Sequence, residues 1–188
     1  MIEMLELYDK WIEKTSSLVG KLKAYPEIFE KPEHKKFHKF FDKALFTSLN
    51  QLDLVIGLKY LDFSQAVGNK LEANYFARVV ILNSHEILND LNKIVGKEIR
   101  NDLVLKVGEK DVKDLDDSIK NLNTLRKEHL KTLKELRNKV LGHKLSDAHQ
   151  QAKMIFKIDL IKVYKIGNEI SKVQMKVMLN LTNLISKI

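Results

Sequence analysis

An arginine and a histidine stand six residues apart in this sequence, at Arg137 and His143. An arginine side chain is a permanent cation, and its planar guanidinium can bind two phosphate oxygens at once. A histidine side chain can move a proton near neutral pH. In principle these two side chains suffice to cleave RNA without a metal. The imidazole would assist attack by the 2′-hydroxyl or protonate the leaving oxygen, and the guanidinium would stabilise charge on the phosphate.

The spacing of the pair limits how it can act. On an unbroken helix, six residues turn through about 600° and rise about 9 Å, so the two side chains would lie roughly 120° apart. They would not converge on one phosphate without help. Either Gly142 breaks the helix and turns His143 back, or two subunits pool their residues. An apolar face is made by Leu133, Leu136 and Val140. Arg137 and His143 both lie at the margin of this face, where a dimer cleft could form.

The segment around this pair resembles the signature of the HEPN superfamily: an arginine, a polar residue, four more residues and a histidine. Here it reads Leu-Arg-Asn-Lys-Val-Leu-Gly-His and ends at His143. It is similar to the version in stand-alone HEPN proteins of abortive-phage-infection and toxin–antitoxin systems. The resemblance implies an all-helical bundle, a homodimer, an antitoxin protein as a further partner, and a metal-independent endoribonuclease site shared across the dimer axis. It also implies that Arg137 and His143 are catalytic and that Asn138 orients them. One departure is Leu145, where some HEPN toxins carry a tyrosine.

The positive charge of the chain is concentrated around this motif. Residues 1–125 contain 19 Lys and Arg against 20 Asp and Glu, whereas residues 126–188 contain 14 against 5, so the net charges are −1 and +9. A local positive field favours a polyanion such as nucleic acid, an acidic partner or an anionic surface. We therefore expect RNA as the ligand, with its phosphates bound by Lys134, Lys139 and Lys144. The alternative is a solvated lysine-rich face.

The composition excludes several kinds of site and of protein. The chain of 188 residues contains no cysteine, which excludes disulfides, thiolate metal sites and cysteine nucleophiles. Residues 1–11 are acidic and do not read as a signal peptide. No stretch approaches the roughly 18 uncharged apolar residues of a membrane span. We therefore expect a cytoplasmic protein without a membrane partner.

The remaining histidines offer no second catalytic constellation. His34 and His38 are four residues apart, as in a two-ligand metal site, but no third ligand is well placed and neighbouring lysines would repel a cation. The pair His85-Glu86 lacks the second histidine of a zinc-protease helix, so we interpret His85 as packing at the edge of the core. His129 is interpreted as a satisfied core or interface histidine. No metal and no other cofactor is expected.

Helical spacing of apolar residues runs through most of the chain. We predict one all-α domain over residues 1–188, a helical bundle of about five helices that is HEPN-like. Residues 98–112 are predicted as a connector, in which 103–108 form a short strand or a loop. The last helix, from about 147, is apolar over a broad arc, which favours contact with a partner subunit as well as the core. The five predicted helices cover residues 2–24, 33–62, 69–97, 115–141 and 147–187.

Two other functions remain open at this point. A catalytically silent helical module would bind nucleic acid or a partner protein through the same basic third of the chain. A DNA-binding regulator is a further alternative, although no persuasive helix-turn-helix pattern is present. The Arg–His pair in the basic segment favours the ribonuclease.

Overall fold

The structure is a computed structural model that describes residues 2–23, 35–90, 97–141 and 148–188. These described residues are helical almost throughout and contain no strand, which confirms the predicted all-α class. Gly68 and Gly108 lie in turns and have positive φ angles of 74° and 94°, a conformation that glycine adopts without steric cost.

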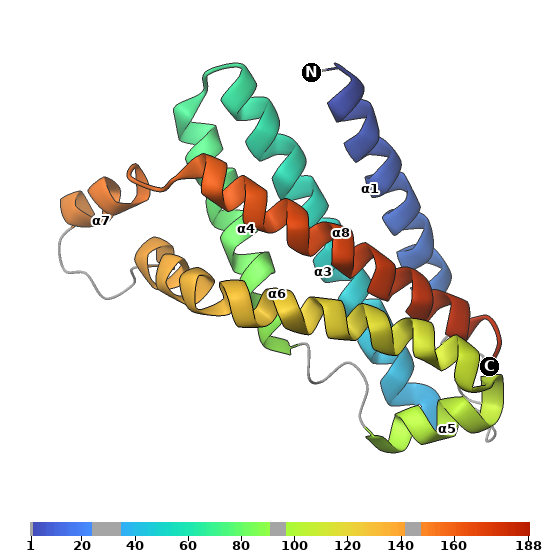
Figure 1. Ribbon diagram of the computed structural model, residues 1–188. Helices are drawn as coiled ribbons and strands as arrows, with labels where there is room; N and C mark the ends of the chain where they lie inside the picture. The colour runs from blue at the N-terminus through green and yellow to red at the C-terminus, as the bar shows by residue number, and fades with distance from the viewer. Residues whose placement is uncertain (1, 24–34, 91–96, 142–147) are drawn as a thin grey trace.

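Seven α-helices and one short 3-10 helix make up the described part of the chain, which is more than the predicted five or so. Figure 1 shows their arrangement around α8. The elements are α1 (Ile2–Lys23), η1 (Lys35–Phe37), α3 (His38–Ala66), α4 (Lys70–Asp90), α5 (Lys97–Val107), α6 (Glu109–Leu141), α7 (Ala148–Ile155) and α8 (Leu160–Ile185).

The predicted connector at 98–112 is wrong, because these residues belong to α5 and to the first turn of α6. Ile99, Leu103 and Val107 recur every four residues and form the inner face of α5, with Leu103 fully buried. Leu105, on the opposite side, is 83% exposed. A run of consecutive apolar residues is therefore split between two sides of a helix and is not a strand.

The predicted single helix over 147–187 is also wrong, because it consists of two helices, α7 and α8. Asp159 is the residue that caps the start of α8. Its side chain accepts a hydrogen bond from the backbone N–H of Lys162 at 3.0 Å. A carboxylate in this position satisfies a free amide at the start of a helix and stabilises the helix dipole.

The core lies where α3, α4 and α8 pack on one another, with α1 against α3 and with α6 across α4 and α8 (Figure 1). Helix α8 approaches α3 and α4 closely at Gly167. A Cβ atom built on Gly167 would lie 2.5 Å from Cγ1 of Val80 and 3.1 Å from Cδ2 of Leu58. Only a residue without a side chain therefore lets α8 come this near to α3 and α4. Fully buried large residues of the core include Phe40, Leu54, Leu58, Leu61, Ile81, Leu88, Leu122 and Leu133.

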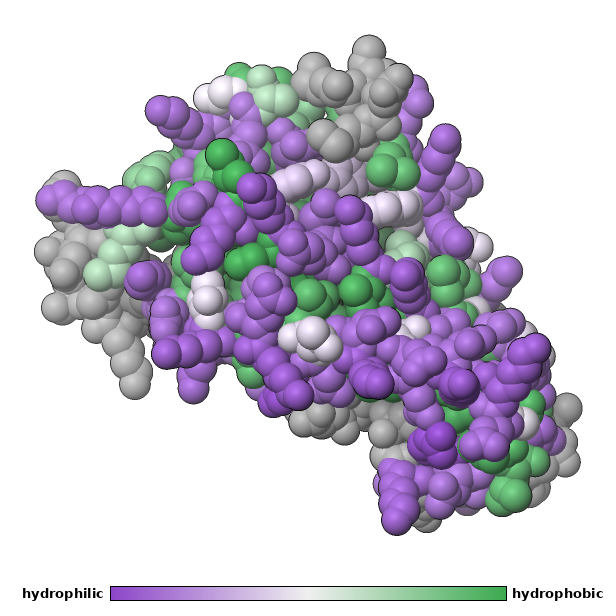
Figure 2. Space-filling view, viewed as in Figure 1, coloured by the Kyte–Doolittle hydropathy of each residue, from purple (hydrophilic) through white to green (hydrophobic). Residues whose placement is uncertain are grey.

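Helices α6 and α8 run antiparallel and are joined by polar contacts along their length. Nδ2 of Asn180 donates to Oγ of Ser118 at 2.7 Å, and Nε2 of His129 lies 3.1 Å from Oε2 of Glu169. Figure 2 shows that hydrophilic residues dominate this face of the molecule, with apolar residues showing between the two helices. The pairing aligns α6 so that its C-terminal turns extend alongside the start of α8.

No helix among the described residues has both the length and the apolar character that crossing a membrane requires.

Candidate functional site

The C-terminal turns of α6 carry four of the six predicted site residues. Lys134, Arg137, Asn138 and Lys139 all lie within Glu109–Leu141. His143 and Lys144 lie outside the described residues, as does Gly142, so the position of His143 relative to Arg137 stays a prediction. The negative end of the α6 dipole is favourable for cations such as Arg137 and Lys139.

Arg137 lies on the face of α6 that packs against α4. Counting along α6, positions 122, 126, 130, 133 and 137 are spaced by three or four residues and so share one side of the helix. Leu122 and Leu133 on this side are buried, and Nε of Arg126 donates to the backbone carbonyl of Leu88 in α4 at 3.1 Å. The apolar spacing of α6 therefore places Arg137 at the edge of the α4–α6 contact.

The Arg137 side chain is half-buried and has no acidic partner among the described residues. Its Nε atom is buried without a hydrogen-bond partner. Arg100 provides the contrast, since its Nη2 atom lies 2.6 Å from Oδ2 of Asp116. A buried donor that lacks a partner costs about 1–3 kcal/mol, more where the group is charged. Arg137 is thus a half-buried cation for which the described part of the chain records no acidic partner.

The other described residues of the predicted site differ from Arg137 in exposure. Lys134, Asn138 and Lys139 are exposed, as phosphate-binding lysines need to be. The structure records no hydrogen bond between Asn138 and Arg137, so the orienting role of Asn138 stays a prediction.

His85 of α4 faces the same end of α6, which the sequence did not indicate. Burial lowers the pKa of His85, and the positive charges of Arg137 and Lys134 lower this pKa further, while Asp90 opposes them. The Nδ1 atom of His85 is buried and has no hydrogen-bond partner in the described part of the chain. One feature of the sequence could have indicated that His85 faces the core: it lies four residues after Ile81, which is on the buried side of α4. A single sequence does not show which helix covers that side.

The two other histidines with described side chains are engaged elsewhere. The predicted role of His129 as a satisfied histidine is confirmed by its contact with Glu169. His38 is exposed and its Nδ1 atom lies 3.2 Å from Oδ2 of Asp42. His34 lies outside the described residues. Within the ranges that the structure describes, no group of three His, Cys, Asp or Glu residues is arranged to hold a metal ion.

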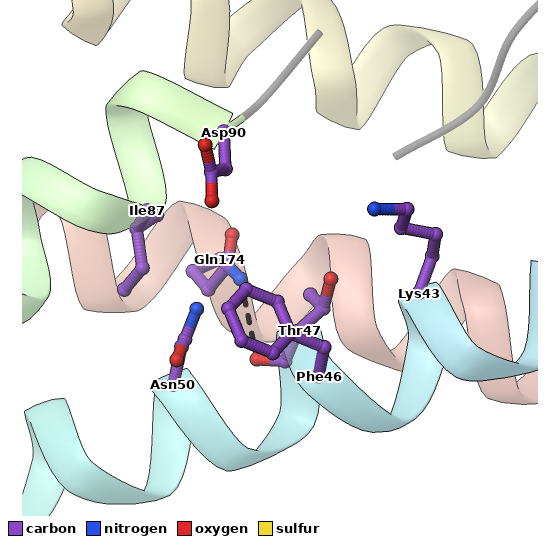
Figure 3. A pocket seen from close by; sticks show the side chains of 7 residues that line it. All are labelled: Lys43, Phe46, Thr47, Asn50, Ile87, Asp90 and Gln174. Atoms are coloured by element: carbon purple, nitrogen blue, oxygen red, sulfur yellow. Dashed lines mark hydrogen bonds between the residues drawn. The ribbon is translucent and has the colours of Figure 1, made fainter. Parts of the chain in front are cut away.

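A separate pocket lies between α3, α4 and α8 (Figure 3). Lys43 and Asp90 reach over it from α3 and α4. At its base Gln174 donates through Nε2 to the backbone carbonyl of Thr47 at 3.4 Å, and its Oε1 atom is buried without a partner. Opposite charges and a free amide oxygen suit a small polar molecule such as water. None of the lining residues belongs to the predicted site.

At the contact of α4 and α6, Arg137 and Lys134 therefore lie close enough to His85 to act on its pKa, and the described ranges record no acidic partner of Arg137. These basic side chains are suited to bind an anion. Scans of protein-family models, of curated proteins and of solved structures each return no match to this chain.

Proposed function

We propose that this protein is a metal-independent endoribonuclease of the HEPN type that acts in phage defence or growth arrest. The observation that carries the proposal is the half-buried guanidinium of Arg137, which begins the Arg–His motif and has no acidic partner among the residues that the structure describes. An all-helical architecture is also what the resemblance implies. Such a guanidinium is suited to bind a phosphate group through its terminal nitrogens, since a phosphate supplies negative charge and hydrogen-bond acceptors.

The chemistry follows from the residue types. The 2′-oxygen of one nucleotide attacks the adjacent phosphorus, the bond from phosphorus to the 5′-oxygen breaks, and a 2′,3′-cyclic phosphate forms. His143 takes the proton from the 2′-hydroxyl or gives a proton to the leaving 5′-oxygen. Arg137 stabilises the charge that develops on the phosphate oxygens. Asn138 orients the pair, and the lysines at 134, 139 and 144 bind neighbouring phosphates.

The direct test is an assay of the purified protein on mixed RNA with EDTA present. Products that end in a 2′,3′-cyclic phosphate or a 3′-phosphate support the proposal. A 2′-deoxy nucleotide at the cut site removes the nucleophile and blocks the reaction. RNA that binds but stays intact would instead support the second candidate, a catalytically silent module. That candidate is favoured by the exposed lysines of α6, which bind phosphates whether or not cleavage follows.

We expect the protein to be a homodimer with residues 137–144 near the two-fold axis. The reason is that Arg137 and His143 would point roughly 120° apart on one continuous helix, and pooling the residues of two chains would then complete a site. A stable dimer would bury at least about 1,000 Å² in total. Light scattering of the eluting protein at micromolar concentration measures its mass, and a monomer would contradict this expectation.

RNA affinity should fall steeply as the salt concentration rises. Each lysine or arginine that neutralises a phosphate releases a counterion, which gives a slope of about −0.7 per contact for single strands in a plot of log affinity against log salt. Fluorescence anisotropy between low and physiological salt measures this slope. Lys134→Ala and Lys139→Ala should each make it shallower, and a flat response of the wild type would argue against phosphate binding.

A further inference from the structure

We infer that His85 of α4 and Arg137 of α6 bind the same phosphate group of an RNA strand, with Lys134 at the edge of this site. The inference takes RNA as the ligand from the proposed function. It adds His85, a residue outside the Arg–His motif, as a second ligand of the phosphate. The juxtaposition depends on the tertiary structure alone, because His85 and Arg137 lie far apart in the sequence and the packing of α4 on α6 brings them within electrostatic reach of each other.

The side chains of His85 and Arg137 each have a buried part and an accessible part. Each is half-buried, and in each only the inner nitrogen is buried without a partner: Nδ1 in His85 and Nε in Arg137. The structure records no hydrogen bond or ion pair for the other nitrogens of these two residues within the described ranges. Nε2 of His85 and the terminal nitrogens of Arg137 are therefore the atoms left to face a ligand.

The charges around His85 favour an anion over a cation. The groups that act most strongly on its ring are Arg137 and Lys134 from α6 and Asp90 from its own helix, and none from α3 or α8 ranks among them. Two positive groups oppose one negative group, so the imidazole of the free protein stays neutral over more of the pH range. An anion placed between His85 and Arg137 removes this repulsion, because it neutralises the field of the guanidinium.

Phosphate binding and protonation of His85 are consequently linked. In the free protein the pKa of His85 is lowered, and a bound phosphate raises this pKa because it favours the charged imidazolium. When RNA binds at a pH between these two values, His85 takes up one proton from solvent. By the same linkage, RNA affinity increases as pH falls through this range.

The probe is a hexamer of 2′-O-methyl RNA, which binds but cannot be cleaved through a 2′-hydroxyl. Ring resonances of the histidines are followed by NMR from pH 5 to 8.5, with and without the hexamer, at constant ionic strength set by chloride. The His85 signal is assigned by its loss in His85→Gln. We expect the hexamer to raise the pKa of His85 and to leave the ring resonances of His129, which contacts Glu169, at their positions in the free protein. Arg137→Gln should raise the pKa of His85 in the free protein and reduce its response to the hexamer.

Two substitutions at the same position separate hydrogen bonding from proton uptake. His85→Ala should weaken hexamer binding at pH 6 by about tenfold, because a hydrogen bond to a charged group is lost. His85→Gln keeps a donor near the position of Nε2 but cannot be protonated. The His85→Gln variant should bind the hexamer more tightly than His85→Ala does. Its affinity for the hexamer should lack the part of the pH dependence that protonation of His85 causes. His129→Gln is the matched control and should bind like the wild type, and circular dichroism verifies that each variant is folded.

The outcomes distinguish this inference from the proposed function. If the hexamer leaves the pKa of His85 unchanged and His85→Ala binds as the wild type does, His85 is not a phosphate ligand, even if Arg137 and His143 prove essential for cleavage. If the hexamer raises this pKa but the protein never cleaves RNA, the phosphate site stands and the ribonuclease proposal is wrong. A hexamer that does not bind at all overturns both.

Discussion

In the Arg137→Ala variant we expect the rate of RNA cleavage to fall by about 10²–10³-fold, because removing one electrostatic stabiliser of a transition state typically costs this much. His143→Ala should lower the rate by about 10²–10⁴-fold, which is the usual contribution of a positioned proton-transfer group. Gel analysis of labelled RNA under single-turnover conditions measures both rates. Cleavage by the wild type should persist in EDTA.

Matched substitutions outside the site control for general effects on stability. Arg100→Ala removes an arginine that is paired with Asp116, and His38→Ala removes an exposed histidine beside Asp42. Both should cleave RNA at the wild-type rate. Circular dichroism and light scattering test whether the Arg137 and His143 variants keep their fold and oligomeric state. If both of these variants cleave as fast as the wild type, the silent interaction module becomes the better account of the chain.

The second large effect concerns stability. Gly167→Ala should lower the free energy of unfolding by about 1–3 kcal/mol, the usual cost of overpacking a core. The added Cβ would lie 2.5 Å from Cγ1 of Val80, which is buried and β-branched and so has little freedom to move away. The gain in helix propensity from glycine to alanine, about 1 kcal/mol, offsets part of this cost. Urea denaturation measures the change.

Gly20→Ala is the control for this substitution. Gly20 lies within α1, is exposed, and would place its new Cβ in open space, so only the gain in helix propensity remains. It should therefore stabilise the protein by about 0.5–1 kcal/mol. The double variant Gly167→Ala/Val80→Ala removes the clashing methyl group and should be less destabilised than the sum of its single changes. Strictly additive effects would contradict a direct clash between these two positions.

Local patterns were enough to predict the helical class. The apolar spacing in α1, α3, α4 and α6 reports one buried side of each helix, and this depends only on residues three or four positions apart. The positive φ angles of Gly68 and Gly108 are likewise a local property that glycine tolerates best. The placement of Arg137 at the margin of an apolar face was also visible in the spacing of Leu133 and Leu136.

The errors lie where two local patterns compete. Residues 103–107 are apolar at four of five positions, and such a run fits a strand or one side of a helix equally well. The segment forms a helix because Leu103 is buried against the rest of the core, whereas Leu105 is exposed. At the start of α8, the capping role of Asp159 was hidden in a continuous apolar pattern that reads as one helix.

The sequence by itself determined which residues can do chemistry, and the tertiary structure alone decided which of them meet. Residue types and their spacing identify Arg137, because a cation in a basic, amphipathic segment can be recognised without knowing its neighbours in space. The approach of His85 to Arg137 and the contact that requires glycine at 167 depend on how helices distant in sequence cross. Helix periodicity specifies which side of a helix is buried, but the crossing partners are selected by the combined packing of all the side chains in the core.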